Sequence, residues 1–121
     1  RGRPAHPAGR AREMTFDVLL TEDALRDLED ITAHIAAHDS PQAARRVLDK
    51  VSDAFTRLSE LPDRGTFPPE LLEVGIRDYR EVRFKPYRIL YGVTENLVHI
   101  LLIADGRRDL RALLERRLLS G

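Results

Sequence analysis

Arginine and tyrosine side chains are concentrated between residues 77 and 91, the part of the chain best suited to chemistry, and all three tyrosines lie there. An arginine guanidinium can form paired hydrogen bonds with a phosphate or a carboxylate, and a tyrosine can stack on a base or donate a hydrogen bond. Such a set could hold RNA, another phosphate or an acidic protein. Its cationic and phenolic members are Arg77, Tyr79, Arg80, Arg83, Lys85, Tyr87, Arg88 and Tyr91.

A purely structural interpretation of the same residues stays open. Arginines are rarely buried unless they are paired, and Asp78 and Glu81 are close enough in sequence to pair them. Tyr87 and Tyr91 could pack in the core with their hydroxyl groups hydrogen-bonded. One residue of strand register decides which of these side chains share a face of the sheet.

A second basic cluster lies near the C-terminus, where the spacing of leucines predicts a helix over residues 107–119. Arg107, Arg108 and Arg111 would surround its first turn, where bases oppose the helix dipole. We expect Asp105 to cap this helix. Two further bases fall in its last turn, where they favour the dipole, so their expected role is structural; these are Arg116 and Arg117.

The sequence suggests neither a metal site nor a nucleophile. The chain has no cysteine. His34 and His38 have the spacing of two helical metal ligands, but no third ligand completes the pattern. His99, in an apolar run, is more typical of a hydrogen-bonded core histidine than of a general base. No glycine-rich phosphate loop or nucleophile motif is recognisable, so no cofactor is expected.

The 121 residues are enough for one domain, and their formal net charge is zero. Residues 14–60 nevertheless hold ten acids against five bases, and residues 61–121 hold eleven bases against nine acids. This asymmetry predicts interaction surfaces of opposite sign. Residues 1–13 are rich in Pro, Gly, Ala and Arg and are predicted to form a disordered leader before a domain at 14–121. A basic arm that binds nucleic acid is the alternative for the leader.

The elements that must position these residues follow from periodicity and capping signals. A short strand is expected at residues 16–20. Thr21 then precedes an amphipathic helix over residues 22–38, and Ser40 begins a second helix that ends before Pro62. The connection is so short that the two helices must form an antiparallel hairpin.

Residues 62–78 are predicted to form a loop rich in Gly and Pro, in which residues 70–74 could form one turn of helix. Three strands are predicted after it, at residues 78–84, 87–94 and 97–104. Their short connections predict an antiparallel meander. The third strand is apolar on both faces and is expected to be central. The result is an α+β fold of order β-α-α-β-β-β-α, with the helical hairpin packed on a small, mainly antiparallel sheet and a C-terminal helix. The other face of the sheet is left for a partner or for the last helix.

A series of short motifs, in this order, resembles the toxins of the RelE/ParE superfamily, which belong to bacterial type II toxin–antitoxin modules. The resemblance covers residues 16–119, and the superfamily has the fold expected above. The matching positions are Thr21-x-x-Ala24-x-x-Asp27-Leu28-x-x-Ile31, Ala43/Ala44, Leu61-Pro62-x-Arg64-Gly65, Pro69-Glu70-Leu71, Tyr79-Arg80-Glu81, Pro86-Tyr87-Arg88-Ile89-x-Tyr91 and Gly106-Arg107-Arg108-Asp109-Leu110, followed by Leu113-Leu114-x-x-Arg117.

The superfamily has two branches with different targets. Resemblance to the RelE-like branch implies a metal-independent, ribosome-dependent mRNA endoribonuclease, with Arg83, Arg88 and Arg107 on the scissile phosphate. That branch commonly uses a Tyr or His near the C-terminus as acid or base, and residues 107–121 contain neither. The ParE-like branch poisons DNA gyrase. Because residues 107–121 lack such a Tyr or His, we favour this branch and expect no catalytic residue. A third hypothesis is a regulatory module that acts only with its antitoxin on operator DNA.

Both branches imply a cognate antitoxin whose C-terminal segment, a helix and an extended piece, wraps the toxin. We expect its acidic side chains to meet the basic strands and the last helix. Operator DNA would be reached only through the antitoxin, no membrane contact is implied, and the expected location is the cytoplasm. The expected partner-binding residues are Tyr79, Arg80, Arg83, Tyr87, Arg88, Tyr91, Arg107, Arg108 and Arg111.

Overall fold

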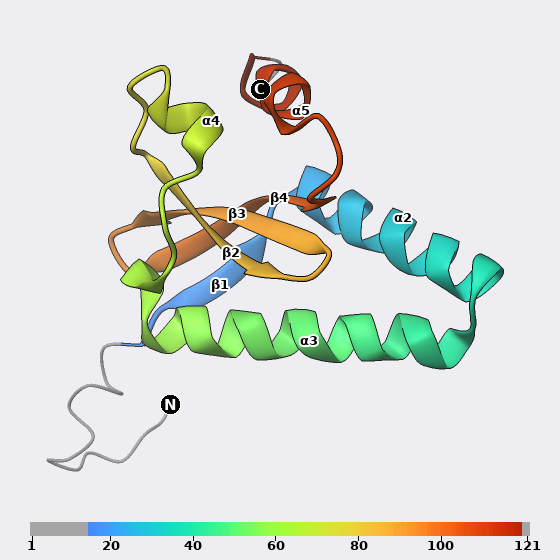
Figure 1. Ribbon diagram of the computed structural model, residues 1–121. Helices are drawn as coiled ribbons and strands as arrows, with labels where there is room; N and C mark the ends of the chain where they lie inside the picture. The colour runs from blue at the N-terminus through green and yellow to red at the C-terminus, as the bar shows by residue number, and fades with distance from the viewer. Residues whose placement is uncertain (1–14, 120–121) are drawn as a thin grey trace, which may run out of the picture.

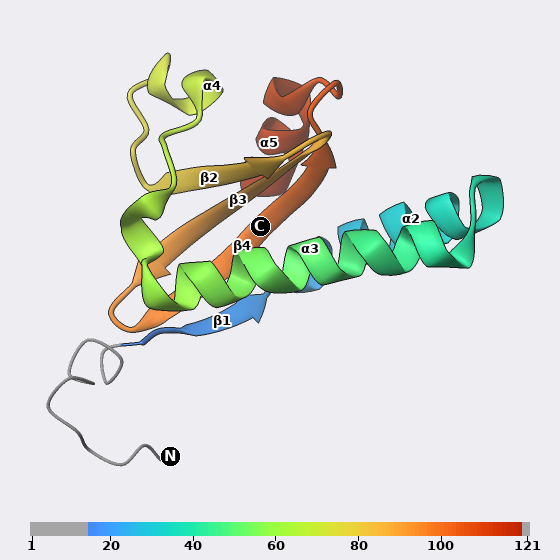
Figure 2. The same cartoon turned by 60° about the horizontal axis from the view of Figure 1, so that its bottom comes forward.

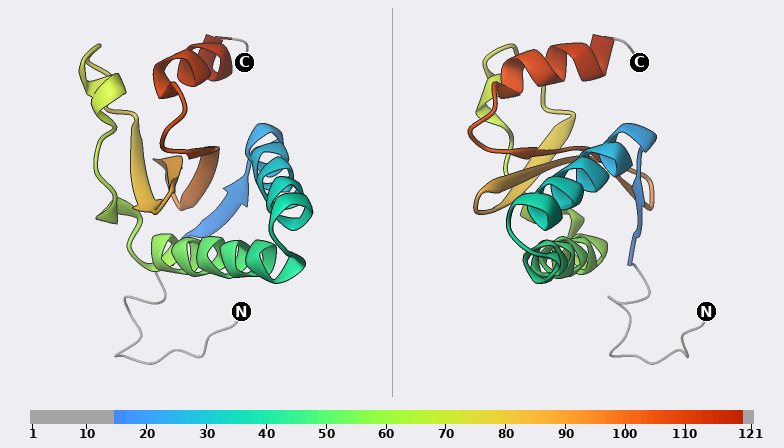
Figure 3. Two further views of the ribbon diagram at one scale, coloured as in Figure 1. Left: turned by 45° about the vertical axis from the view of Figure 1, so that its right-hand side comes forward. Right: turned by 90° about the vertical axis from the view of Figure 1, so that its right-hand side faces the viewer.

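The computed structural model describes residues 15–119. Within this range a four-stranded sheet lies between two helical layers (Figures 1 and 3). A hairpin of α2 (Glu22–His38) and α3 (Pro41–Glu60) covers one face of the sheet. The short α4 (Pro69–Leu72) and the C-terminal α5 (Leu110–Leu119) cover the other face. The predicted α+β fold is confirmed.

The strands β1 (Asp17–Leu20), β2 (Tyr79–Phe84), β3 (Tyr87–Thr94) and β4 (Leu97–Asp105) are arranged in the order β1-β4-β3-β2. β4 is central, as its apolar run predicted, and pairs in parallel with β1 and antiparallel with β3. β2 pairs antiparallel with β3, so the expected meander is present, and Figure 2 shows β2 at an edge of the sheet.

Capping residues determine where the hairpin helices begin. The Thr21 hydroxyl accepts a hydrogen bond from the Ala24 amide at 3.1 Å, and the Ser40 hydroxyl accepts one from the Ala43 amide at 3.0 Å. Each cap satisfies an amide that has no partner within its own helix. The Thr21 hydroxyl also donates to the Ile100 carbonyl at 2.9 Å, which ties the start of α2 to the central strand.

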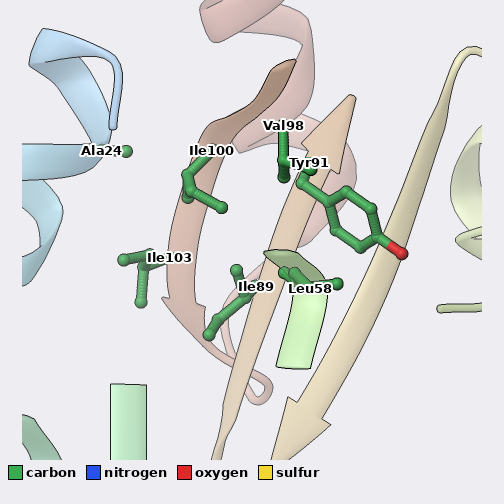
Figure 4. Packing of buried hydrophobic residues seen from close by; sticks show 7 residues of the cluster. All are labelled: Ala24, Leu58, Ile89, Tyr91, Val98, Ile100 and Ile103. Carbon is green, nitrogen blue, oxygen red and sulfur yellow. The ribbon is translucent and has the colours of Figure 1, made fainter. Parts of the chain in front are cut away.

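Apolar side chains pack on both faces of the sheet, because neighbours along a strand point to opposite sides. The hairpin-side cluster is shown in Figure 4, and its buried members are Ala24, Leu58, Ile89, Tyr91, Val98, Ile100 and Ile103. The buried members of the α4/α5-side cluster are Leu71, Leu90, Leu102, Ala104, Leu110 and Leu114.

The structure corrects the beginning of the last helix. α5 begins at Leu110 rather than at residue 107, so Arg107 and Arg108 lie in the turn before the helix and not in its first turn. The carboxylate of Asp105 accepts a hydrogen bond from the Arg107 amide at 2.8 Å and so stabilises that turn. Asp109 takes the capping role expected of Asp105, because its carboxylate accepts the amide three residues later at 3.1 Å.

Other predictions differ from the structure in smaller ways. Strand ends move by one residue. In the loop predicted over residues 62–78, the turn of helix expected near residues 70–74 is present as α4, and a 3₁₀ turn that was not expected, η2 (Pro62–Arg64), precedes it. The leader predicted at residues 1–13 lies outside the described residues. No helix within residues 15–119 is both long and apolar enough to cross a membrane.

Candidate functional site

Arg83 and Arg88, two of the cations predicted to hold phosphate, are direct cross-strand neighbours in the β2–β3 pair. Side chains that oppose each other in an antiparallel pair share one face, here the face covered by α4 and α5. Like charges in this position destabilise a sheet unless a counter-charge is near. Glu81, two residues before Arg83 and therefore on the same face, supplies that counter-charge.

Arg88 is held in a buried ion cluster with Glu81 and Glu70. Its Nε donates to Glu81 Oε1 at 2.7 Å, and its Nη2 donates to Glu81 Oε2 at 3.0 Å. Its Nη1 and Nη2 each donate to the Glu70 carboxylate at 2.9 Å. Hydrogen bonding to Glu70 raises the pKa of Arg88, and the same contact lowers the pKa of Glu70. The cluster is therefore stable in its charged form.

The cluster corrects the prediction that Arg88 binds a phosphate or a partner. Arg88 is 6% exposed and Glu81 is 2% exposed, and the guanidinium fork is already matched to two carboxylates. The alternative that Glu81 pairs the arginines is confirmed. Arg83 also donates to Glu81 Oε2, at 3.1 Å, but its side chain is 58% exposed. Arg83 is therefore the member of this pair that a partner can reach.

The three arginines at the start of α5 have different contacts. Arg107 donates to the Asp105 carboxylate through Nε at 3.0 Å and Nη2 at 2.7 Å, and these bonds hold the pKa of Asp105 at about 2. Arg111 pairs with Glu73 and so joins α5 to the segment after α4. Arg108 has no ion-pair partner within residues 15–119. All three are exposed, so they stay candidates for partner contact.

Tyr91 is a core residue, which corrects a second prediction of partner contact. It is fully buried in the hairpin-side cluster, and its hydroxyl points away from the apolar residues around it (Figure 4). The hydroxyl donates to the Pro62 carbonyl at 2.7 Å and accepts from the Gly65 amide at 3.0 Å. Burial raises the pKa of Tyr91. A Cβ at residue 65 would lie 2.6 Å from this hydroxyl, so the close approach requires glycine.

The remaining predicted contacts are half-buried. Tyr87 packs beside Phe84 with 5.7 Å between ring centroids, and burial raises its pKa. Tyr79 packs against the α4/α5-side cluster. Arg80 donates to a loop carbonyl at 2.9 Å, and its guanidinium lies 4.5 Å from the centroid of the Phe67 ring. Arg80 therefore holds the loop before α4, and only part of each side chain is open to a partner.

Arg117 is structural, as expected, but for a reason that the sequence did not indicate. Its Nη1 and Nη2 donate to the Asp27 carboxylate at 3.0 and 3.1 Å, and its Nη1 also donates to the Leu101 carbonyl at 2.7 Å. These bonds join α5 to α2 and to the central strand. Helix-dipole reasoning indicated no such bridge, because its partners are distant in sequence.

A basic cleft of about 400 Å³, which was not predicted from the sequence, lies between α3 and the edge strand β2. Lys50 and Arg57 line it from α3, Arg64 lines it from the end of η2, and Arg83 lines it from β2. Lys50 and Arg57 are two helical turns apart and so share a helix face. That spacing is the sequence signal that could have indicated the cleft.

Neither the histidines nor the carboxylates suggest a metal centre in residues 15–119, where no suitable group of three or more ligands occurs. His34 and His38 stack on each other with 4.1 Å between ring centroids. His99 lies so close to Gly92 that a Cβ there would be 2.5 Å from its Nε2.

Comparisons with known proteins point to one group of proteins. A family model described as "ParE toxin of type II toxin-antitoxin system, parDE" matches residues 18–110. Curated relatives include two proteins of Caulobacter vibrioides. Toxin ParE3 is 29% identical, with 83% of this chain and 96% of the relative covered. Toxin RelE2 is 36% identical, with 75% and 96% covered.

Solved structures with a similar fold include the chromosomal ParDE system from P. aeruginosa. It has a TM-score of 0.62 at 18% identity, and the match covers 76% of this chain and 97% of that one. The toxin-antitoxin complex RelBE2 from Mycobacterium tuberculosis has a TM-score of 0.53 at 26% identity, with 75% and 98% covered.

Proposed function

The chain belongs to the ParE toxin family of type II toxin–antitoxin systems, and from this premise we propose that it inhibits DNA gyrase and is neutralised by a cognate antitoxin. The proposed antitoxin is supported by the similar structures, which are described as a ParDE system and a RelBE2 toxin-antitoxin complex. Gyrase acts on DNA in the bacterial cytoplasm, so action in the cytoplasm is part of the proposal. Operator DNA would be reached through the antitoxin.

The observation that favours gyrase over RNA cleavage is the buried cluster of Arg88, Glu70 and Glu81. A metal-free ribonuclease must place cations on the scissile phosphate and an acid or base beside it. The Arg88 guanidinium is instead bound to carboxylates at distances of 2.7–3.0 Å. Its charge is balanced internally, and the carboxylates beside it would repel an incoming phosphate.

The tyrosines are poorly placed to transfer a proton near Arg83. Tyr87 precedes Arg88 and therefore points to the opposite face of the sheet. Tyr79 shares the face of Arg83 but lies four residues away along β2, about 13 Å at the usual rise of a strand. Tyr91 is buried, and its hydroxyl is already hydrogen-bonded. The arrangement supports a toxin that acts by binding.

Ribosome-dependent RNA cleavage is the second candidate function. It is favoured by the 36% identity to Toxin RelE2 and by the exposed guanidinium of Arg83. This alternative predicts codon-phased cleavage of mRNA in a translating extract, and Arg83→Ala would abolish it. Arg46→Ala, on the exposed surface of α3, is the matched control.

Supercoiling of relaxed plasmid by purified gyrase tests the main proposal. The purified toxin should inhibit supercoiling in proportion to its concentration, and equimolar antitoxin should restore it. The same preparation should leave translation and mRNA intact in the extract. Normal supercoiling at a large molar excess of folded toxin would falsify the proposal.

A further inference from the structure

The basic cleft between α3 and β2 gathers cations that the protein itself does not balance. Lys50 and Arg57 line it from α3 and Arg64 lines it from the end of η2, and all three residues are exposed. None of the three has an ion-pair partner within residues 15–119. Figure 3 shows α3 passing below β2, with the loop between α3 and α4 at one end. The cations therefore come from two different segments that meet at the cleft.

The acids that line the cleft offset little of this charge. Glu81 and Arg83 belong to β2, and their side chains lie on the α4/α5 side of the sheet, where Arg83 donates to Glu81 at 3.1 Å. This pair leaves the charge of the cleft unchanged. Asp53 is the exposed acid among the lining residues. Several cations beside one carboxylate attract an anion, because the walls of a cleft focus their field.

The floor of the cleft is apolar. Val82 and Phe84 alternate along β2 and so point to the hairpin side, and Ala54 lines the cleft from α3. All three are half-buried and pack on the hairpin-side cluster. An apolar floor with a few charged groups around it is typical of sites for small molecules. The volume of about 400 Å³ also lies within the usual range of such sites, about 300–1,000 Å³.

We propose that the cleft is a binding site for a nucleotide. A nucleotide combines a phosphate, a sugar with hydroxyl groups and a flat base, and the cleft offers a partner to each. The guanidinium forks of Arg57 and Arg64 match a phosphate, and Lys50 adds a point charge. The base would lie on the apolar floor. Asp53, one helical turn before Arg57, would accept hydrogen bonds from the sugar hydroxyl groups beside the phosphate.

A free nucleotide is favoured over a nucleic acid strand. Single strands are usually bound by aromatic rings on which successive bases stack. Phe84 is the aromatic residue among the lining residues, and it is half-buried beside Tyr87. Such a ring offers contact to one base and no platform for the next. The cleft lies on the hairpin side of the sheet and the Arg88 cluster on the other side, so this inference goes beyond the proposed function and does not rest on it.

Titration of the isotope-labelled chain, followed by NMR, tests the site. The ligands are AMP, GMP, CMP and UMP, with adenosine and inorganic phosphate as the separate parts. The best of the four nucleotides should shift the Ala54 and Val82 amide signals saturably and bind at least about tenfold more tightly than either part, since each part meets only a portion of the cleft. The amide of His34, in the last turns of α2, is the reference and should not shift. If no nucleotide binds more tightly than inorganic phosphate or adenosine, the proposal is overturned.

Neutralisation of the cleft tests its cations. Arg57→Gln combined with Arg64→Gln should weaken nucleotide binding by about tenfold or more. The matched control removes the same number of charges from the exposed surface of the hairpin, by Arg26→Gln combined with Arg45→Gln, and should bind the nucleotide like the parent. Circular dichroism checks that both variants are folded. Equal losses in the two variants would mean that only net charge matters, which overturns the proposal.

Asp53→Ala distinguishes a nucleotide site from a simple anion site. Removing an acid beside the cations should strengthen the binding of inorganic phosphate. The ratio of nucleotide affinity to phosphate affinity should nevertheless fall about tenfold, because the sugar loses a charged hydrogen-bond acceptor. An unchanged ratio, or a single-stranded 12-mer DNA that binds these residues more tightly than any of the nucleotides, would overturn the proposal. Gyrase inhibition is measured separately, so either result can fail without the other.

Discussion

On the hairpin side of the sheet, Ile89 and Tyr91 of β3 pack against Leu58 of α3 in a cluster of apolar side chains. Leu90, which lies between them in β3, points to the other side of the sheet. Arg88 points to that same side, and its guanidinium is enclosed by carboxylates. One strand thus supplies an apolar contact to one layer and a charged contact to the other. Both layers pack on apolar clusters, but the α4/α5 layer is also held by the buried ion pairs of Arg88.

The difference explains how α4 stays in place. A helix of four residues is far too short to be stable alone. Leu71 supplies apolar contact, and Glu70 fixes the helix to the sheet through Arg88. The hairpin helices are long and rest on a wide apolar surface. The position of α4 therefore depends on ion pairs much more than the position of α3 does.

Removing Glu81 is expected to have the largest effect on the difference between the two sides of the sheet. Glu81→Leu leaves Arg88 buried with only Glu70 to balance it, and breaking a buried ion pair from one side costs about 3–5 kcal/mol. Urea unfolding followed by circular dichroism measures the loss. Arg88→Met added to this variant should recover most of it, because no unpaired charge is then buried. An unchanged unfolding midpoint in the single variant contradicts the role of the cluster.

Leu58→Ala tests the apolar side. Leu58 is fully buried, and the cavity left by the truncation costs about 2–5 kcal/mol. Unlike the loss in the Glu81 variant, this loss should not be recovered by a second truncation in the same cluster, since the missing contacts are apolar. Exposed Leu48→Ala on the same helix is the control and should change the unfolding free energy little. Recovery by a second truncation would show that the two faces do not differ as described.

Tyr91→Phe tests the role of the Tyr91 hydroxyl, a polar group at the border of the apolar hairpin-side cluster. The ring stays, but the buried Gly65 amide loses its partner, which costs about 1–3 kcal/mol. The unfolding free energy should fall while the α-helical signal persists. A variant as stable as the parent would mean that solvent reaches the amide of residue 65.

Lowering the pH is expected to have the smallest effect on the difference between the two sides of the sheet. Hydrogen bonding to Arg88 holds the pKa of Glu70 in the folded chain below its ordinary value of 4.5, so the unfolded chain binds more protons in this range. The stability from the Arg88–Glu70 contact is present above pH 4.5 and is lost as pH falls through the lowered folded pKa. Glu70→Gln should lower the unfolding free energy by about 1 kcal/mol at pH 7, because the contact is partly exposed. It should also flatten the pH dependence of the unfolding free energy between about pH 5 and 3. Urea unfolding at a series of pH values measures this. If the unfolding free energies of the parent and of Glu70→Gln change with pH in the same way, the assignment of this pH dependence to Glu70 is wrong.

Much of the fold could be predicted because its signals are local. Thr21 and Ser40 are caps whose partners lie three residues away, and the apolar run of β4 predicted a central strand. The start of α5 was predicted wrongly because two aspartates were available as caps. The choice between Asp105 and Asp109 depended on how far β4 extends along its neighbour.

The sequence by itself determined the elements, their order, the family and the accumulation of arginine and tyrosine in β2 and β3. Only the tertiary structure decided what those side chains do. Arg88 and Glu70 are 18 residues apart, and Tyr91 and Gly65 are 26 apart, so strand register and the docking of α4 bring each pair together. The same packing leaves the Arg83 side chain exposed on an edge strand. Contacts between distant segments depend on burial and geometry, which composition and local spacing do not specify.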